Sequence, residues 1–464
     1  MGIRKISLKQ FALDPKLGLK DYSLINSTKG YRLKNILKNT DVSTDIKSGR
    51  TPSKYNPDYW LGDIEFLTMQ DINTSTYVLM PKVSAHITKY AVENEKTLYQ
   101  APANSLIVSN AMTIGLAFIV DRPIYLNQNV FHFNIDETKY NITFLKWYFN
   151  LKIRKAFQSI FASKYYSKDE YSRLILPNID IALQNEFATK IKELELELNL
   201  LDTSRTLDVD IINNVIAEEL DFNLETFKKL KAENKFSSNL KEFGNNIDCR
   251  FSFKFHNRAG QFVWDFLSSK TNKRIKDFIS EPIVLGKSVS PKDYDDDGDY
   301  FYIAMSNIKT WAFDAEGCKT VSNAYSKSNM NKSVKKDDII LARSGEGTIG
   351  KVALIENEEI KAIHADFTQR IRLTNYNPRL AYYYMRSDLF QYLVYTHKKG
   401  LGNNTNIFPS QVQEFPIPDW DETKQTELVD KIKTQIDAQK EIDKQIAEKQ
   451  AEISAIIEKA LETE

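Results

Sequence analysis

Residues 177–192 read PNIDIALQNEFATKIK, and residues 418–433, 241 positions later, read PDWDETKQTELVDKIK. The two stretches keep one register without a gap. Pro177, Asp180, Gln184, Glu186 and Lys190-Ile191-Lys192 recur as Pro418, Asp421, Gln425, Glu427 and Lys431-Ile432-Lys433. Self-similarity at a long, fixed period indicates that one structural unit has been used more than once. The chain is therefore expected to hold two copies of one unit.

The match continues upstream of these stretches, with offsets that drift. Gly62-Asp63 corresponds to Gly298-Asp299, Thr113-Ile114-Gly115 to Thr348-Ile349-Gly350, and Arg32-Leu33-Lys34 to Arg274-Ile275-Lys276. Drifting offsets are what two copies of one fold show when their loops differ in length. A chain of 464 residues also exceeds what one hydrophobic core usually organises.

Each copy begins with a globular half. Short, β-branched, turn-bounded segments predict strands at Ser105–Val108, Leu116–Val120, Asp338–Ala342 and Lys351–Ile355. Longer aromatic-rich segments predict helices within Ile142–Phe157 and Pro378–Tyr395. The globular halves are therefore expected to be α+β, or mixed α/β.

Each copy ends in a long helical half with apolar residues at coiled-coil spacing. The residues expected to pack along this seam are Phe187, Ile191, Leu194, Leu198 and Leu201 in the first copy and Leu428, Ile432, Ile442, Ile446 and Ile453 in the second. Such a stripe is typical of a coiled coil or of ordinary core. The distal helix, Asp421–Glu462, would be about 63 Å long at 1.5 Å per residue. Because a narrow stripe cannot be buried alone, we expect the two helices to form an antiparallel coiled coil.

Composition places the chain among globular proteins of a reducing compartment. Apolar residues make up 42% and aromatic residues 12% of the sequence, which is far from a disordered composition. Two cysteines, Cys249 and Cys318, are too few for a disulfide framework. No run approaches the length of a membrane span, so we expect a cytoplasmic protein without a membrane partner.

The net charge of +1 hides an uneven distribution. Residues 421–464 hold 12 acidic residues against 7 Lys, so the rest of the chain sums to about +6. Nucleic-acid binding normally leaves a basic footprint. The average charge therefore does not exclude it.

The sequence offers no complete catalytic or metal motif. Asn56-Pro57-Asp58-Tyr59 lacks the second proline of the adenine methyltransferase motif, and no Gly-x-Gly cofactor loop precedes it. Asp293-x-Asp295-x-Asp297-Gly298 begins like an EF-hand, but its twelfth position is Ala304. The five histidines (His86, His132, His256, His364 and His397) lack zinc spacing, and no nucleotide-binding loop occurs. We therefore expect no catalytic residue, no cofactor and no metal.

Several motifs occur in an order that resembles a known family. They are Gly49-Arg50-Thr51-Pro52, Trp60-Leu61-Gly62-Asp63-Ile64 and Thr68-Met69-Gln70-Asp71-Ile72 in the first copy, and Asp337–Arg343, Thr348–Lys351 and Phe415–Pro418 in the second. With the duplication, they make the chain similar to the specificity subunit of type I restriction-modification systems. The resemblance implies two target-recognition domains that alternate with two conserved helices.

The resemblance also implies function and partners. Each domain would enter the major groove at one half of a bipartite double-stranded DNA site, and the helices would set the distance between the halves. The helices would also dock two DNA methyltransferase subunits, with restriction and translocase subunits joining the complex. The chain itself would be a non-catalytic subunit of that enzyme.

Polar residues in loops are the candidates for DNA contact, because loop side chains can reach base edges and phosphates. In the first domain they are Arg50, Thr51, Lys54, Ser109, Asn110, Lys164, Tyr165, Tyr166 and Lys168. In the second they are Lys287, Ser288, Arg343, Ser344, Lys398, Lys399, Asn403, Asn404 and Thr405. The alternative is that the arginines are solvated surface charges and that Tyr165-Tyr166 is a buried pair supporting its loop.

The expected organisation is a first target-recognition domain at 1–180, a central helix at 181–236, a second domain at 237–418 and a distal helix at 419–464. Three other functions remain open. They are the recognition subunit of another restriction or phage-defence methylation system, a coiled-coil scaffold that binds no DNA, and a metal-dependent nuclease.

Overall fold

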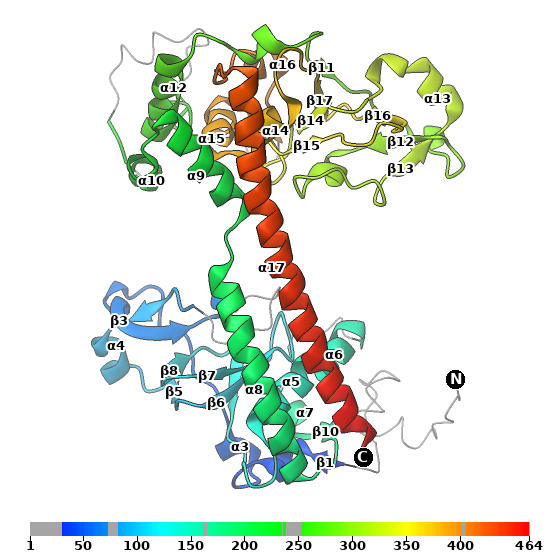
Figure 1. Ribbon diagram of the computed structural model, residues 1–464. Helices are drawn as coiled ribbons and strands as arrows, with labels where there is room; N and C mark the ends of the chain where they lie inside the picture. The colour runs from blue at the N-terminus through cyan, green and yellow to red at the C-terminus, as the bar shows by residue number, and fades with distance from the viewer. Residues whose placement is uncertain are drawn as a thin grey trace. The chain divides into compact units, whose positions relative to one another are not determined.

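The computed structural model describes residues 30–72, 82–160, 165–233, 235–237, 252–400 and 404–463, with the side chains of 158–160 excepted. The candidates Lys164 and Asn403 lie outside these residues. The chain forms two units (Figure 1), one made of Met1–Arg205 with Ile442–Glu464 and the other of Thr206–Glu441. These units cut across the four segments expected from the sequence, because the distal helix contributes to both. The segment bounds stay a prediction.

The first unit holds two four-stranded sheets. One has the order β2 (Ile46–Lys47), β9 (Val130–Phe133), β6 (Ser105–Ser109) and β7 (Ala117–Val120), with antiparallel neighbours. The other has the order β4 (His86–Ile87), β3 (Trp60–Leu67), β8 (Ile124–Leu126) and β5 (Tyr99–Ala101), in which β3 and β8 are parallel. A two-stranded sheet pairs β1 (Tyr31–Arg32) with β10 (Ile175–Leu176).

The second unit repeats this topology. Its larger sheet has the order β11 (Val284–Leu285), β17 (Thr368–Ile371), β14 (Ile339–Ala342) and β15 (Val352–Leu354), again antiparallel. Its smaller sheet has the order β13 (Lys319–Val321), β12 (Tyr300–Ile303) and β16 (Ala362–His364), with β12 and β16 parallel. The antiparallel sheets have equal strand orders, and β13, β12 and β16 repeat the order and directions of β4, β3 and β8, with no counterpart of β5 among the described residues. These shared arrangements confirm the prediction of two similar α+β domains.

Helices cover one face of the first unit's antiparallel sheet, the one formed by β2, β9, β6 and β7. They are α5 (Ile142–Tyr148), a π-helical stretch (Phe149–Ile153), α6 (Arg154–Ile160), α7 (Lys168–Ser172) and α8 (Ile181–Ser204), with the short α3 (Val42–Asp45) and α4 (Lys89–Asn94) elsewhere in the unit. Fully buried aromatic rings such as Trp147, Phe144 and Phe149 fill the core that these helices share with the sheet. The domain core therefore extends directly into the long helix.

The last part of α17 (Glu422–Glu462) runs antiparallel to α8 within the first unit (Figure 1). Arg205 Nε lies 2.9 Å from a carboxylate oxygen of Asp443, and Lys449 Nζ lies 2.9 Å from Glu197. Since 205 meets 443 and 197 meets 449, the two helices run in opposite directions. The expected antiparallel pairing is confirmed here.

The seam residues expected from the sequence belong to the domain cores. Phe187, Ile191, Leu198, Ile446 and Ile453 are buried in the first unit's core, with Leu194, Leu201 and Ile442 partly buried beside it. Leu428 and Ile432 are buried in the second unit's core. The stripes thus pack against sheet-covering helices as well as along the helix pair.

Helices of the second unit are α9 (Asp208–Leu220), α10 (Leu224–Ala232), α12 (Arg258–Lys270), α13 (Asn323–Ser328), α14 (Pro378–Arg386), α15 (Asp388–His397), α16 (Pro409–Val412) and the first part of α17. The segment expected as one helix within Pro378–Tyr395 is two, because Ser387 leaves the helical conformation. Its side chain accepts a hydrogen bond from the N–H of Phe390 and so caps α15.

The expected central helix at 181–236 is likewise three helices. Arg205 is extended and ends α8, after a run of polar residues with low helix propensity. Asp221 takes a left-handed conformation, with φ of 57°, and ends α9. The side chain of Asn223 then caps α10. At the break after α8, the side-chain amide oxygen of Gln439, on α17, accepts a hydrogen bond from the N–H of Thr206 at 2.7 Å.

The duplicated stretch that opens each long helix carries a shared connection to its domain. In the first unit, the buried Gln184 accepts from the N–H of Asn141 at 3.0 Å and donates to the carbonyl of Ile179 at 2.8 Å. In the second, Gln425 accepts from the N–H of Asn377 at 2.6 Å and donates to the carbonyl of Trp420 at 2.7 Å.

A tyrosine adds a second connection at the same place. Tyr140 donates to the carbonyl of Pro177 at 3.3 Å, and Tyr376 donates to that of Pro418 at 3.1 Å. Buried backbone groups need such partners. The repeated Pro and Gln therefore fix where each helix leaves its domain.

Candidate nucleic-acid interface

Three loops of the first unit meet around Gln128, which follows β8. Gly49 lets the first loop pass close to β8, since a Cβ at this position would lie 2.1 Å from the carbonyl oxygen of Leu126. Thr51, in the same loop, then donates its hydroxyl to Gln128 Oε1 at 2.7 Å. The amide of Asn110 donates to the backbone carbonyl of Gln128 at 3.1 Å. The loops after β2, β6 and β8 are thereby joined.

A fourth segment of the first unit attaches through Asn110. The N–H of Tyr166 donates to the Asn110 carbonyl at 2.8 Å. Ser109 donates to the carbonyl of Thr113, and the hydroxyl of the buried Tyr171 donates to the carbonyl of Ser109 at 2.7 Å. These hydrogen bonds join the loops in the interior, because Ser109, Asn110 and Tyr166 are all buried.

The second unit builds the same arrangement from different residues. A Cβ at Gly286 would lie 2.1 Å from the carbonyl oxygen of His364, so this loop also passes close to a neighbouring strand. Ser288 donates its hydroxyl to a carboxylate oxygen of Asp366 at 2.9 Å. Arg343 Nε donates to the backbone carbonyl of Asp366 at 2.8 Å, and its Nη1 donates to Asn406 Oδ1 at 3.1 Å. The loops after β11, β14, β16 and α15 thus converge.

A charged network lies beside this convergence. Lys398 is buried and lies 2.9 Å from a carboxylate oxygen of Glu346, and this pairing helps hold the pKa of Glu346 below its usual range. Thr405, also buried, donates to the same carboxylate at 3.1 Å. Ser344 donates to the Thr405 carbonyl at 3.3 Å. These three candidate residues therefore shape the loop from within.

The structure thus separates the candidate residues by exposure. Those exposed or half-buried are Arg50, Thr51, Lys54, Tyr165, Lys168, Lys287, Ser288, Arg343, Lys399 and Asn404. Those buried are Ser109, Asn110, Tyr166, Ser344, Lys398 and Thr405. Only the first group can reach a ligand without movement of the loops.

Both loop clusters carry like charges close together. Burial and the neighbouring charge of Lys47 lower the pKa of Lys168, whose ammonium also lies 5.7 Å from the ring centre of Phe131. In the second unit, burial together with the charges of Arg370 and Lys287 lowers the pKa of Lys332. Adjacent cations favour an anionic ligand such as a phosphate backbone.

Sequence reasoning missed several residues of these clusters. Gln128 and Asp366 accept the hydrogen bonds that join the loops, yet each is one polar residue among many. Phe367 and Phe408 are 46% and 39% exposed. Only the predicted order of strands and loops pointed to Gln128 and Asp366. Nothing in the sequence pointed to the exposure of the Phe367 and Phe408 rings.

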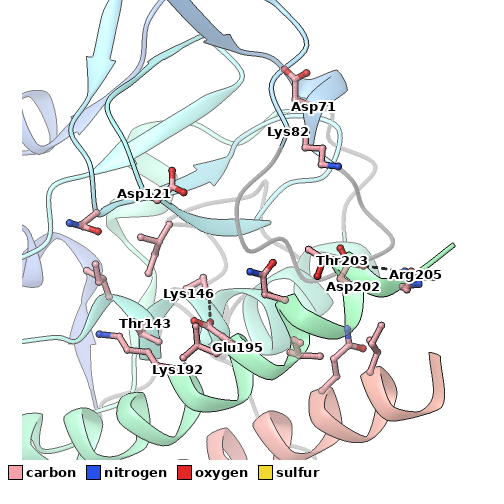
Figure 2. Close-up of a pocket in the computed structure, with 18 of the residues that line it drawn as sticks. Asp71, Lys82, Asp121, Thr143, Lys146, Lys192, Glu195, Asp202, Thr203 and Arg205 are labelled. Atoms are coloured by element: carbon pink, nitrogen blue, oxygen red, sulfur yellow. Dashed lines mark hydrogen bonds and ion pairs between the residues drawn. The ribbon is translucent and has the colours of Figure 1, made fainter. Parts of the chain in front are cut away.

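The first unit also has an open cleft of about 1430 Å³ between the globular half and the helix pair, lined by residues such as Asp71, Asp121, Lys192 and Gln450 (Figure 2). At its base Lys146 pairs with Glu195, which also accepts from the indole N–H of Trp147. Because Lys146 is buried, desolvation lowers its pKa. Both partners are engaged with each other, so this pair joins α5 to α8.

The described residues contain no group of three His, Cys, Asp or Glu side chains placed to hold a metal ion. Across the same residues, no helix is both long enough and apolar enough to cross a membrane.

Comparison with known proteins identifies one family. Residues 34–202 and 268–451 both match the type I restriction modification DNA specificity domain. Over 84 residues, the chain is 30% identical to the type I restriction enzyme MjaIX specificity subunit of Methanocaldococcus jannaschii, covering 18% of this chain and 19% of that protein. It is 26% identical over 85 residues to the HindI specificity subunit of Haemophilus influenzae, covering 18% of each. These alignments therefore span about a fifth of each relative's length.

Solved structures of such subunits align over nearly the whole chain. The S subunit of a type I restriction-modification system from M. genitalium aligns with a TM-score of 0.45 and 13% identity, covering 96% of this chain and 98% of that one. The HsdS subunit of Thermoanaerobacter tengcongensis aligns with a TM-score of 0.31 and 12% identity, covering 93% and 96%. On the two family matches, which together span most of the sequence, the chain belongs to the type I restriction-modification DNA specificity family and carries its domain twice.

Proposed function

We propose that this chain is the non-catalytic specificity subunit of a type I restriction-modification enzyme and that each domain recognises one half of a bipartite DNA sequence. The observation that carries the proposal is the duplicated loop cluster. In both domains a glycine allows close approach to a strand, and a hydroxyl in the same loop bonds to an acceptor in a neighbouring loop. The scaffold is repeated while the exposed side chains differ.

Differing side chains on one scaffold suit the recognition of two unlike half-sites. The first domain exposes Arg50, Lys54 and Tyr165, whereas the second exposes Lys287, Ser288 and Asn404. Base edges in the major groove are distinguished by their hydrogen-bond donors and acceptors. Phosphate contacts from the lysines would orient each domain on the duplex without specifying sequence.

The first unit's helix pair offers a surface for the partner subunits. Leu196 and Leu200 of α8 are 67% and 70% exposed and lie one turn apart on the same side of the helix. Exposed leucines gathered on one helix face commonly mark a protein interface. We propose that a DNA methyltransferase subunit covers them, that two such subunits join the complex with restriction and translocase subunits, and that this assembly acts on DNA in the cytoplasm.

The docking proposal predicts a selective loss of assembly. L196D with L200D is expected to abolish co-purification of the methyltransferase encoded beside this chain, while the melting temperature of the isolated chain stays within a few degrees of wild type. L61D is the control, since Leu61 is a 96% exposed leucine of the globular half. Unchanged co-purification of the double variant would remove α8 from the interface.

The recognition proposal is tested by expressing the chain with its genomic neighbours and mapping methylated bases across a host genome. The expected result is one motif with two fixed halves and a spacer of constant length. Absence of sequence-selective methylation, with the complex assembled and active, would contradict the proposal and favour a scaffold without DNA specificity.

A further inference from the structure

The most constrained exposed side chain in either loop cluster is Arg343, at the end of β14. Its guanidinium lies between two aromatic rings, 5.7 Å from the ring centre of Phe367 and 5.9 Å from that of Phe408. Cation–π contacts of this kind hold the guanidinium in position. The rings come from two different loops, so the position of the arginine depends on both.

Hydrogen bonds fix the same side chain at two of its three nitrogens. Nε donates to the carbonyl of Asp366 and Nη1 donates to Asn406 Oδ1. The backbone is held as well, since the N–H of Arg343 donates to the Phe367 carbonyl at 3.0 Å and its carbonyl accepts from Ile407 at 2.9 Å. A planar fork restrained at Nε and Nη1 loses little conformational entropy when a ligand binds.

The end of the guanidinium formed by Nη2 and the remaining N–H of Nη1 is available for a ligand. Among the described residues, no side chain or carbonyl accepts a hydrogen bond from Nη2, and no carboxylate forms an ion pair with Arg343. Three of its five N–H groups therefore have no acceptor among the residues that the structure describes. Phe367 and Phe408 leave the guanidinium only half-buried, so this end can be reached from solvent.

The first domain does not reproduce this feature. Asn110 takes the place of Arg343 in its sheet, since its N–H donates to the carbonyl of Asn129 at 3.0 Å as that of Arg343 donates to the carbonyl of Phe367. Asn110 is buried, and Asn129, in the place of Phe367, carries no ring. The arginine between two rings belongs to the second domain alone among the described residues of the two loop clusters. A feature present in one copy of a repeated scaffold is a candidate for specificity.

We propose that Arg343 recognises a guanine in the half-site bound by the second domain, with Phe367 and Phe408 holding the guanidinium in the plane of the base. Two parallel N–H groups of a positioned arginine match the O6 and N7 acceptors of guanine in the major groove. This inference rests on the proposed function, because it assumes that the second domain binds DNA.

The test uses the complete methyltransferase complex containing this chain and a set of duplexes. Each duplex carries the mapped motif with one base pair of the second half-site replaced. The wild-type complex is expected to discriminate against replacement of one particular guanine, and R343A is expected to lose that discrimination by roughly 10- to 100-fold. Recognition of the other positions and of the first half-site is expected to persist. F408A, which removes one ring and keeps the arginine, is expected to lose part of the same discrimination.

R386A is the matched control. Arg386 also lies between two aromatic rings, at 6.0 Å from Trp311 and 5.3 Å from Tyr382, but it is paired with Asp208 and lies outside the loop cluster. Its replacement is expected to leave every base preference unchanged. Loss of discrimination in R386A equal to that in R343A would show a general effect on folding and overturn the assignment.

Other outcomes are equally decisive. R343A could instead weaken binding to all duplexes alike and reduce the slope of log K against log salt concentration by about one. Arg343 would then contact a phosphate, and the inference would be wrong. A second half-site without guanine would also overturn it. If the wild-type complex recognises no split motif at all, the proposed function itself fails, which is a result distinct from a split motif that R343A leaves unchanged.

Discussion

Gly49 and Gly286 allow the loops after β2 and β11 to lie against neighbouring strands. At Gly286 a Cβ would lie 2.1 Å from the carbonyl oxygen of His364 and 2.2 Å from that of Ala365, and backbone atoms cannot give way as a flexible side chain can. G286A is therefore expected to lower the free energy of unfolding by about 1–3 kcal/mol and to displace the loop that carries Ser288. Urea denaturation of the purified chain measures this change.

Gly347 provides the control for that substitution. It lies in another loop of the second domain, and a Cβ there would meet no atom within 4 Å. G347A is expected to change the free energy of unfolding by less than about 0.5 kcal/mol, as surface substitutions usually do. Equal effects of the two substitutions would show that close approach at Gly286 does not matter.

A buried histidine makes the first domain sensitive to acid. His132 lies in β9 and bonds through Nδ1 to the hydroxyl of Tyr99 at 2.7 Å, and burial lowers its pKa to about 4. Because the folded state resists protonation, stability is present above the ordinary histidine pKa near 6.5 and is lost as the pH falls toward 4. The loss amounts to about 3 kcal/mol. His364 in the second domain has the same sign of shift.

H132Q should remove this part of the acid sensitivity, since glutamine can bond to Tyr99 and does not titrate in this range. Between pH 7.5 and 4.5, the melting temperature of wild type is expected to fall relative to that of the variant, because only wild type carries the histidine that is protonated on unfolding. A constant difference across the range would mean that His132 does not take up a proton on unfolding.

At the residue scale the sequence predicted which segments form loops better than it predicted which of their side chains are exposed. Within the first domain the loop holding Arg50 meets the loops after β6 and β8, and within the second the loop holding Arg343 meets the loops after β16 and α15. Whether a polar side chain within them is buried depends on partners far along the chain. Ser109 and Asn110 are buried by Tyr171 and Gln128, which no local pattern indicates.

At the scale of elements, each long helix is attached to its domain by a buried glutamine. Replacing Gln184 by leucine leaves the N–H of Asn141 and the carbonyl of Ile179 without this partner. Each unmet buried polar group costs about 1–3 kcal/mol, so Q184L is expected to lower the free energy of unfolding by that amount or more. Q425L should behave alike in the second domain.

Gln435 serves as the control for these glutamines. It lies on α17 and is exposed, and among the residues that the structure describes its side chain has no hydrogen bond to another element. Q435L is expected to change stability by less than about 0.5 kcal/mol. A loss as large as that of Q184L would argue against the glutamine connection as the cause.

The helices also show what periodicity can and cannot predict. Seven-residue spacing predicted α17 almost to the residue, as Asp421–Glu462 against Glu422–Glu462 in the structure. The break between α8 and α9 was not predictable from spacing alone. It lies directly after the polar residues Asp202-Thr203-Ser204, which have low helix propensity, and at Arg205, whose guanidinium pairs with Asp443 on another helix.

At the scale of the whole molecule, the chain is one recognition unit used twice and completed by its last helix. The first unit takes its final element from Ile442–Glu464, and the second takes Glu422–Glu441 of the same helix. Duplication was visible in the sequence because the helix stretch repeats without a gap. The division of α17 between the two units was not visible in the sequence, because it depends on which core each part of the helix contacts.

The central claim is that each domain specifies its own half of a divided DNA site. The most direct measurement maps genomic methylation by the complex after residues 31–180 have been replaced with the corresponding domain of another family member. The account predicts that one half of the motif changes to the donor's sequence while the other half stays as in the wild type. A motif in which both halves change, or in which neither does, would contradict it.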